Sequence, residues 1–245
     1  MARTINVHLL PSLVAPDELA GKIVVVIDVL RATTTIVHAL AAGASEVIPC
    51  LEIDEALQLA AQNRETSILG GERGGRKIEG FDLGNSPLDY TPAKVGGKSV
   101  VFTTTNGTRA LMRCRNARRV LIGAFINFSA VCRELAGEDS IEIVCAGTDG
   151  DVTREDTLLA GAIVAELSRT ANLQINDQAE IAADAWRSAI GDLTGQSPLS
   201  AAMRRSRGGR NLIEIGQEND IEIAAQLDKF DIVPELDLAA WRIRA

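Results

Sequence analysis

The sequence has few aromatic residues: Phe, Tyr and Trp together make up 3% of its 245 residues. Proteins that bind single-stranded nucleic acids use aromatic side chains as stacking platforms within basic surfaces. This chain instead has a net charge of −8. We therefore expect no nucleic-acid partner, and we expect a core built from Val, Ile, Leu and Ala.

Histidine and paired cysteine are also scarce. Only His8 and His38 are present, which excludes a histidine-rich transition-metal site. The cysteines are isolated in apolar stretches and form no CxxC pair: Cys50, Cys114, Cys132 and Cys145. This spacing favours scattered buried thiols over a zinc site or a disulfide framework. Any bound metal would be held by oxygen atoms, which points to Mg²⁺.

Long apolar runs are missing as well. No segment reaches the ~18 to 20 uncharged apolar residues that a membrane-spanning helix requires. The N-terminal stretch MARTINVHLLPSLVAPDELAGK has an apolar part that is too short and too interrupted for a signal peptide. We expect a cytoplasmic protein without a membrane partner.

Several common catalytic motifs are absent. The chain has no GxxxxGK[ST] sequence of a P-loop NTPase and no GxSxG sequence of a serine hydrolase. A haloacid-dehalogenase-like phosphatase would carry a second Asp two residues after Asp28, where this chain has Leu30. Asp28 therefore does not belong to that pattern.

Strand-like and helix-like segments alternate along the chain. The expected strands cover residues 5–10, 23–29, 46–51, 66–69, 99–103, 119–124, 141–145 and 231–234. The expected helices cover residues 34–42, 54–63, 108–113, 128–136, 156–169, 177–189, 200–207 and 221–227. This alternation predicts an α/β fold in which a mainly parallel sheet has helices on both faces.

The segments that begin at Lys22 and Lys98 are similar to each other. KIVVVIDVLRATTTIVHALAAGASEVI and KSVVFTTTNGTRALMRCRNARRVLI each predict a strand, a Thr-rich turn, a helix and a second strand. A single domain over residues 1–245 with duplicated halves, 1–97 and 98–245, would explain this, and so would two unrelated βαβ units. In either case both turns follow the carboxyl ends of strands, where open α/β sheets place their ligands.

The first polar cluster follows the apolar run VVVI. Asp28, Arg31 and the threonines at 33–35 come after residues 24–27, which we expect to be buried on both faces because they do not alternate. A carboxylate there requires a cation or hydrogen-bond donors. Hydroxyls and free backbone N–H groups at a helix start also form an anion site. N-capping by a Thr would explain one hydroxyl, but not the neighbouring Asp and Arg.

The second polar cluster is TTTNGTRAL. Thr105, Asn106, Gly107 and Thr108 form a polar turn before a helix. Gly107 would permit a positive φ and a close approach of the backbone to a ligand. Asn-Gly is also a common turn dipeptide, so the cluster gains weight mainly from its likeness to the first one.

Residues 70–97 carry the third cluster, within a glycine-rich stretch that we expect to be a long irregular loop. GGERGG and GFDLGNSP place Glu72, Arg73, Asp82 and Asn85 among glycines, where backbone can approach a small ligand. A charged, solvated loop is the alternative. Apolar residues at 78, 81 and 83 would anchor such a loop to the core.

Two further segments are rich in charge. AGTDGDVTREDTLLAG contains Asp149, Asp151, Glu155 and Asp156, although the helix dipole alone favours carboxylates in a first turn. The arginines of RRSRGGRN, residues 204–211, would either clamp an anionic substrate or form a solvated helix face.

Taken in this order, the motifs make the sequence resemble the 2-phosphosulfolactate phosphatase (ComB) family. The matching segments are IDVLRATTTI, GGERGG, GFDLGNSP, TTTNGTRAL, EDTLLAG and SRGGRNLIEIGQENDIEIA. The resemblance implies a Mg²⁺-dependent phosphatase with a three-layer α/β/α fold. The namesake substrate of that family is the phosphate ester of 3-sulfolactate, in coenzyme M biosynthesis.

Together with the polar clusters, the resemblance implies three sets of site residues. The expected catalytic residues are Asp28, Arg31 and Glu72. The expected metal ligands are Asp28, Asp82, Glu155 and Asp156. The expected phosphate-binding and substrate-binding residues are Thr33, Thr34, Arg73, Asn85, Thr105, Asn106, Gly107 and Thr108.

The function that we expect is hydrolysis of the phosphate monoester of a small anionic 2-hydroxy acid, with Mg²⁺ as cofactor. Oxygen ligands, hydroxyl-rich helix starts and arginines are what phosphoryl transfer requires. A non-catalytic binding protein for a small anionic metabolite is the alternative, and the missing P-loop disfavours a nucleotide-dependent phosphotransferase. The apolar helix at 221–227 could also cover a partner in a homo-oligomer.

Overall fold

The computed structural model of the protein describes residues 3–191 and 198–245. Its strands are β1 (Thr4–His8), β2 (Ile23–Ile27), β3 (Glu46–Pro49), β4 (Ser67–Arg73), β5 (Arg76–Lys77), β6 (Ser99–Thr103), β7 (Arg119–Gly123), β8 (Ser140–Cys145), β9 (Gln174–Ile175), β10 (Glu235–Asp237) and β11 (Arg242–Arg244). Its helices are α1 (Ala32–Ala41), α2 (Ile53–Gln62), α3 (Pro92–Val95), α4 (Gly107–Arg113), α5 (Phe128–Leu135), α6 (Arg154–Ser168), α7 (Asp177–Gly191), α8 (Pro198–Arg204), α9 (Arg207–Glu214) and α10 (Asn219–Ala224).

The strands form one sheet in the order β5-β4-β6-β3-β11-β10-β7-β2-β8-β1-β9. Two groups are parallel, β4-β6-β3 and β7-β2-β8-β1-β9. The C-terminal hairpin β10–β11 lies between these groups and pairs antiparallel with β7 on one side and β3 on the other. The predicted, mainly parallel sheet is therefore confirmed, with an antiparallel hairpin at its centre.

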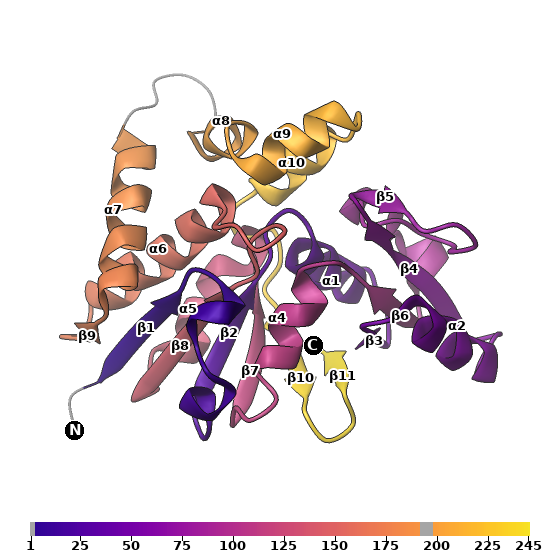
Figure 1. Ribbon diagram of the computed structural model, residues 1–245, viewed down its shortest axis with the longest axis horizontal. Helices are drawn as coiled ribbons and strands as arrows, with labels where there is room; N and C mark the ends of the chain where they lie inside the picture. Colours follow the sequence, from indigo (N-terminus) through magenta and orange to yellow (C-terminus); the bar gives the residue numbers. More distant parts are fainter. Residues whose placement is uncertain (1–2, 192–197) are drawn as a thin grey trace.

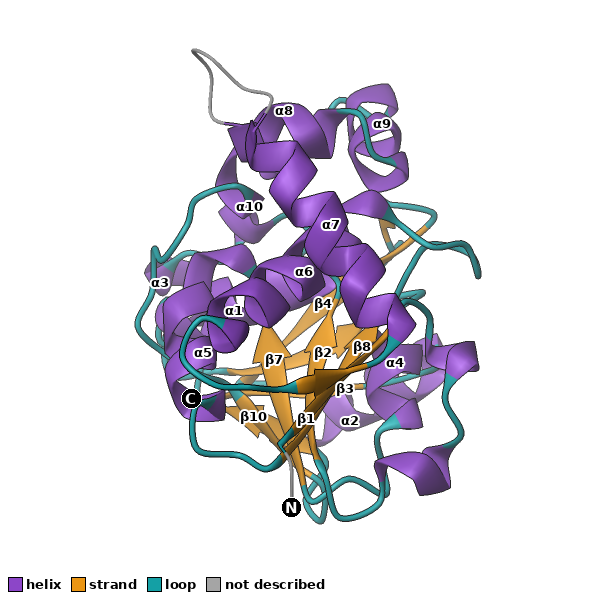
Figure 2. Cartoon of the chain, turned by 90° about the vertical axis from the view of Figure 1, so that its left-hand side faces the viewer, coloured by secondary structure: helices purple, strands orange, loops and turns teal. Residues whose placement is uncertain are grey.

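Helices cover both faces of this sheet. α5 and α6 lie on one side of the central strands and α4 lies on the other (Figure 2). α5 and α6 share an apolar cluster with Val25 and Ile27 of β2, whereas α1 and α4 share one with Val24 and Val26, which point to the opposite face. On the first side α7 packs against α6 and β1. The central strand β2 is buried along its whole length, as its unbroken apolar run predicts for a strand with layers above and below. The α/β architecture in three layers is confirmed.

Helices α8, α9 and α10 form a cap above the carboxyl ends of the central strands (Figure 1). Ile221 and Ala224 of α10 are fully buried and belong to the same apolar cluster as β2 and α6. The apolar face that suggests a partner subunit is thus covered by the chain itself. The predicted helix at 200–207 is two helices, because α8 ends at Arg204 and Ser206 caps the start of α9.

The predicted irregular loop at 70–97 begins inside a strand. β4 continues to Arg73 and turns through two glycines into β5. Gly70 and Gly71 occur in a strand because a side chain on either would collide, with the Tyr90 ring and with the backbone carbonyl of Thr103 respectively. The predicted anchors Ile78, Phe81 and Leu83 are indeed buried in the core.

The predicted strand at 231–234 is wrong, since the strand begins at Glu235. Pro234 has no N–H to donate, and only its carbonyl takes part in the sheet, accepting from Ile122.

Strands from residues 1–97 and 98–245 interleave in the sheet, because β1 and β2 pair with β7 and β8. The two ranges therefore share one sheet, and the duplication of the similar segments stays a prediction.

Two smaller predictions concern thiols and membranes. All four cysteines are free and buried, as predicted. Within the described ranges 3–191 and 198–245, no helix is both long enough and apolar enough to span a bilayer.

Candidate functional site

A cavity of about 410 Å³ opens at the carboxyl ends of β2, β4 and β6, beneath α9. Its lining comes from the β2–α1 turn, the β4–β5 turn, the turn before α4, the loop after β8, and α9. These segments lie far apart in sequence and include the polar clusters singled out above. The two Thr-rich turns that resemble each other meet here, because Gly107 packs directly against Ala32.

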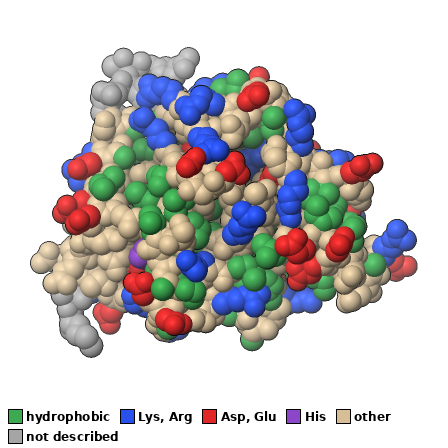
Figure 3. Space-filling model, viewed as in Figure 1, with side chains coloured by type: hydrophobic (Ala, Val, Ile, Leu, Met, Phe, Trp, Pro, Cys, Tyr) green, Lys and Arg blue, Asp and Glu red, His purple; other side chains and the backbone are tan. Residues whose placement is uncertain are grey.

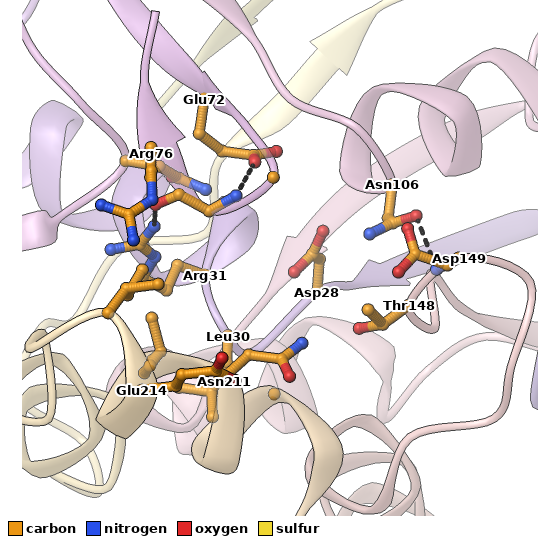
Figure 4. Close-up of a pocket in the computed structure, with 16 residues that line it drawn as sticks. Asp28, Leu30, Arg31, Glu72, Arg76, Asn106, Thr148, Asp149, Asn211 and Glu214 are labelled. Atoms are coloured by element: carbon orange, nitrogen blue, oxygen red, sulfur yellow. Dashed lines mark hydrogen bonds between the residues drawn. The ribbon is translucent and has the colours of Figure 1, made fainter.

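Asp28 lies between the two ends of this pocket (Figure 4). Its side chain is buried, and Oδ1 accepts a hydrogen bond of 3.2 Å from the Ala32 N–H. Burial raises the pKa of Asp28 to about 7, and the charges of Glu72 and Glu155 act in the same direction. The Ala32 N–H and the Arg31 charge lower it only in part. An ionised Asp28 is therefore unfavourable at neutral pH unless a cation shares its charge.

Arg31 lines the pocket but forms its ion pair elsewhere. One guanidinium nitrogen lies 2.7 Å from Asp220 Oδ2 and also donates to Gln217, both from the cap. The other donates to the Gly75 carbonyl at 2.7 Å. The charge of Arg31 lowers the pKa of Asp28, but the direct ion-pair partner of Arg31 is Asp220. Arg31 thus connects the cap to the β4–β5 turn.

Glu72 is held between two turns. Oε1 accepts from the Thr105 N–H at 2.8 Å, and Oε2 accepts from the Gly75 N–H at 2.7 Å. Both oxygens therefore have backbone donors. The geometry makes Glu72 a residue that positions the β4–β5 turn against the turn before α4.

Asp156, in the first turn of α6, is also bound by backbone. It accepts from the Val29 N–H at 2.8 Å and from the Gly147 N–H at 3.0 Å. Burial raises its pKa well above the ordinary range, and the neighbouring charges of Asp28 and Glu155 add to the increase. Asp156 fixes the backbone that immediately follows Asp28.

Glu155 faces the start of α9. Burial raises its pKa, while donors from Ser206 and Gly208 lower it. A Cβ at Gly208 would lie 2.1 Å from Glu155 Oε1, so any larger residue there would displace the Glu155 carboxylate. Oε2 is buried without a hydrogen-bond partner among residues 3–191 and 198–245. One Glu155 oxygen is thus available to a ligand.

Asn106 and Gly107 meet Asp28 from the other side. Asn106 Oδ1 accepts from the Asp149 N–H at 3.2 Å, and its amide nitrogen points toward Asp28 (Figure 4). A Cβ on Gly107 would lie 2.5 Å from the Ala32 Cβ and 2.9 Å from Asp28 Oδ2. Gly107 does not have the predicted positive φ, since it is the first residue of α4. Its role is close packing against Asp28.

The threonine hydroxyls mostly serve the backbone. Thr33 donates to the Asp28 carbonyl at 2.9 Å, and Thr34 donates to the Val29 carbonyl at 2.8 Å. The Thr108 hydroxyl accepts from the N–H of residue 104 at 3.2 Å. These three hydroxyls hold the shapes of the two turns, and their contact with phosphate stays a prediction.

Asn85 and Thr105 have unused polar atoms. Asn85 lines the pocket, and both Asn85 Oδ1 and Thr105 Oγ1 are buried without a partner among the described residues. Buried polar atoms in native proteins are normally hydrogen-bonded. These two atoms are accordingly candidates for ligand contact.

Arg73 and Asp82 lie outside the pocket. Arg73 donates to the Leu51 carbonyl and to Thr103 Oγ1, each at 2.9 Å. Asp82 accepts from the Leu69 N–H at 2.8 Å and lines a separate cavity beside α2. The structure does not bring Asp82 to the other three predicted metal ligands.

The arginines around α9 form a charged surface rather than the wall of the pocket. Arg204 pairs with Glu222, and Arg207 pairs with Asp149 and Asp151. Basic side chains gather over the cap at the top of the space-filling view, with acidic ones beside them (Figure 3). Of the two readings of this segment, the solvated helix face agrees with these contacts.

The sequence matches the 2-phosphosulpholactate phosphatase family model over residues 8–238. The chain belongs to this family. It is 44% identical over 222 residues to a probable 2-phosphosulfolactate phosphatase of Caldanaerobacter subterraneus subsp. tengcongensis, covering 89% of each chain. The proteins of the same name from Symbiobacterium thermophilum and Thermotoga maritima are 44% and 43% identical to it. The match to the Symbiobacterium protein covers 89% of this chain and 92% of that protein, and the match to the Thermotoga protein covers 86% and 88%.

Several residues at or beside the pocket are not among the predicted site residues. Gln217 and Asp220 belong to the matching segment SRGGRNLIEIGQENDIEIA, but only the fold places them on Arg31. Asn211 and Glu214 occur at and after the end of the arginine-rich segment, which drew attention only to its cations. Arg76 comes directly after GGERGG and lines the pocket, whereas the prediction names Arg73 within that stretch.

The oxygen atoms of the site fit Mg²⁺ in type. No three His, Cys, Asp or Glu side chains come close enough together to hold a metal within residues 3–191 and 198–245. Nevertheless, Glu155 Oε2 and Asn85 Oδ1 are buried without a partner, and Asp28 is buried with a raised pKa. Carboxylate and amide oxygens are the ligands that Mg²⁺ prefers.

Proposed function

We propose that this protein is a phosphatase that hydrolyses 2-phosphosulfolactate to sulfolactate and phosphate, with Mg²⁺ as its cofactor. The family and the names of its relatives support the reaction and the substrate. The structural observation that carries the proposal is the buried Asp28 carboxylate in a polar pocket that the family's motifs line. The pocket is large enough for a ligand of this size, since ligand pockets span roughly 300–1,000 Å³.

We assign Asp28 and Glu155 as the protein ligands of Mg²⁺. Asp28 has the raised pKa expected of a carboxylate buried without a cation, and Glu155 has an unpartnered buried oxygen. When bound, Mg²⁺ would neutralise phosphate charge and activate the attacking water. Asp82 and Asp156 are weaker candidates, because one lies in another cavity and the other has two backbone donors.

The remaining residues orient the substrate. The amide nitrogen of Asn106 points toward Asp28, where it would donate to a phosphate oxygen. Arg31 lines the same pocket and retains guanidinium N–H groups beyond those that Asp220 and Gln217 use. Donors fixed by the fold before the reaction stabilise developing charge without reorganisation.

Phosphate release from synthetic 2-phosphosulfolactate tests the proposal. The purified protein should release phosphate with MgCl₂, stop when EDTA is added, and resume when Mg²⁺ is restored. Activity that survives thorough chelation would remove the metal from the mechanism. Thermal stabilisation by the ester without turnover would favour a binding protein, and a requirement for nucleotide would favour a phosphotransferase. The cytoplasmic location and the place in coenzyme M biosynthesis stay predictions.

A further inference from the structure

We propose that Arg76 binds the sulfonate group of the substrate and thereby selects sulfonated phosphate esters over unsulfonated ones. This inference rests on the proposed function and deepens it, because it names a residue that discriminates among phosphate esters. Arg76 lines the pocket from β5, beyond the Gly74–Gly75 turn.

The β4–β5 turn places Arg76 there. Gly74 and Gly75 both have a positive φ, of 59° and 76°, as a two-residue hairpin turn requires. Arg73 and Arg76 are paired across this turn. The Gly75 N–H and carbonyl are held by Glu72 and Arg31, so the turn is fixed on both sides.

Arg76 differs from Arg31, which also lines the pocket, in having no carboxylate partner. Arg31 is paired with Asp220, and Arg73 donates to groups behind the pocket. The Arg76 side chain is exposed, and its guanidinium has no ion pair or hydrogen bond with any side chain or backbone group of residues 3–191 and 198–245, so it is open to a ligand. A free guanidinium in a pocket lining matches an oxyanion, which it can bind with two parallel hydrogen bonds.

The acidic groups of the lining do not cancel this charge. Glu72 has backbone donors on both oxygens, and Asp149 is paired with Arg207. Glu214, on α9, lines the pocket and forms no ion pair with Arg76. Its negative charge would repel an anionic ligand at this end of the pocket, so binding an anion there requires a cation. Arg76 supplies that cation.

The position of Arg76 points to the sulfonate rather than the phosphate. Arg31 and Arg76 lie together at one end of the pocket and Asn106 at the other, with Asp28 between them (Figure 4). The phosphate must reach Asp28. In 2-phosphosulfolactate the carboxylate is attached to the ester carbon itself, whereas the sulfonate extends one carbon further. The sulfonate is therefore the group that reaches the Arg76 end.

The test compares Arg76→Gln with the parent protein on two esters, 2-phosphosulfolactate and 2-phospholactate, which has a methyl group in place of the sulfonated carbon. We expect kcat/KM for the sulfonated ester to fall about 10- to 100-fold, mainly through KM, as for the loss of a charged hydrogen bond. The value for 2-phospholactate should change less than about threefold. Arg76→Lys should recover part of the loss.

Lys77→Gln is the matched control, because it removes the same charge from the neighbouring residue of β5, which does not line the pocket. It should leave both esters unaffected. Equal losses on both esters for Arg76→Gln, or no loss, would overturn the proposal. Calorimetric measurement of 3-sulfolactate and lactate binding to the parent protein and to Arg76→Gln makes the same comparison without turnover. A parent protein that binds sulfolactate through Arg76 but releases no phosphate would refute the proposed function alone.

Discussion

At the scale of single residues, the Asp28 carboxylate is buried and lines the pocket. Asp28→Asn keeps the shape and removes the charge. If Asp28 holds Mg²⁺, several kcal/mol of transition-state stabilisation are lost. We therefore expect phosphate release to fall by at least ~100-fold, at roughly 1.4 kcal/mol per factor of ten. A variant that keeps its specific activity would contradict this role.

The same substitution should stabilise the metal-free fold. The pKa of Asp28 is raised to about 7 in the folded protein, so its ionised form disfavours folding once the pH exceeds the unfolded value. The gain in melting temperature from Asp28→Asn, measured in EDTA, should grow as the pH rises from about 4 toward 7 and then level off. A loss of stability at pH 8 would show that the carboxylate is structural.

Gly107 tests the close packing behind Asp28. Gly107→Ala places a Cβ 2.5 Å from the Ala32 Cβ and 2.9 Å from Asp28 Oδ2. We expect a loss of about 1–3 kcal/mol of stability, the usual effect of overpacking. The shift of Asp28 should also lower kcat. Gly137→Ala is the control, because nothing lies within 4 Å of its Cβ position, and it should leave urea midpoint and activity unchanged.

At the scale of elements, the cap is attached to the sheet by a buried ion pair. Arg31 and Asp220 are each only 3% exposed at the side chain, and Asp220 also accepts from Ser86 at 2.6 Å. Asp220→Asn leaves the Arg31 charge buried without its partner, which typically costs about 3–5 kcal/mol. Urea denaturation should show a loss of this size, and KM should rise because Arg31 lines the pocket.

A second acid of α10 provides the comparison for that prediction. Glu222 pairs with Arg204 on the surface, with side chains 48% and 40% exposed. Exposed pairs contribute about 0.2–1 kcal/mol, so Glu222→Gln should change stability by no more than that. Equal effects of the two substitutions would mean that the Arg31–Asp220 pair does not hold the cap.

At the scale of the whole molecule, two sets of carboxyl groups act on stability in opposite directions. Burial raises the pKa values of Asp28, Glu155 and Asp156, so their contribution to stability is lost as the pH rises through the raised values. Burial would also raise the pKa of Glu142, but hydrogen bonds from His8 and other donors hold it below the ordinary 4.5. Its contribution is present above that value and is lost as the pH falls.

These opposing trends predict that the metal-free protein is most stable at mildly acidic pH. Urea midpoints measured in EDTA between pH 3 and pH 8 should pass through a maximum near pH 5. Glu142→Gln should reduce the loss of stability at acidic pH and leave the decline at higher pH unchanged, because Glu142 is buried beside His8 and Lys22 and away from the pocket. Part of the acidic loss should remain, since the pKa of Glu46 is also lowered. A midpoint that rises continuously to pH 8 would contradict the raised pKa values of the pocket acids.

Local patterns in the sequence determine much of this molecule. The unbroken run VVVI predicts β2, and the alternation of strand-like and helix-like segments predicts helices on both faces of the sheet. The isolated cysteines predict the buried thiols, while the oxygen-held metal inferred from the scarcity of His stays a prediction. These properties depend on neighbours in sequence, which is why they can be predicted without the fold.

Only the tertiary structure decides which polar residues meet. It inserts β10–β11 between the two parallel groups, turns Arg73 away, and leaves Arg76 in the pocket. It also moves Asp82 to another cavity and gives Glu72 two backbone donors. The GGERGG stretch identifies charged residues but does not show which of their side chains point into the pocket, because the direction of a side chain depends on contacts with residues that are distant in sequence.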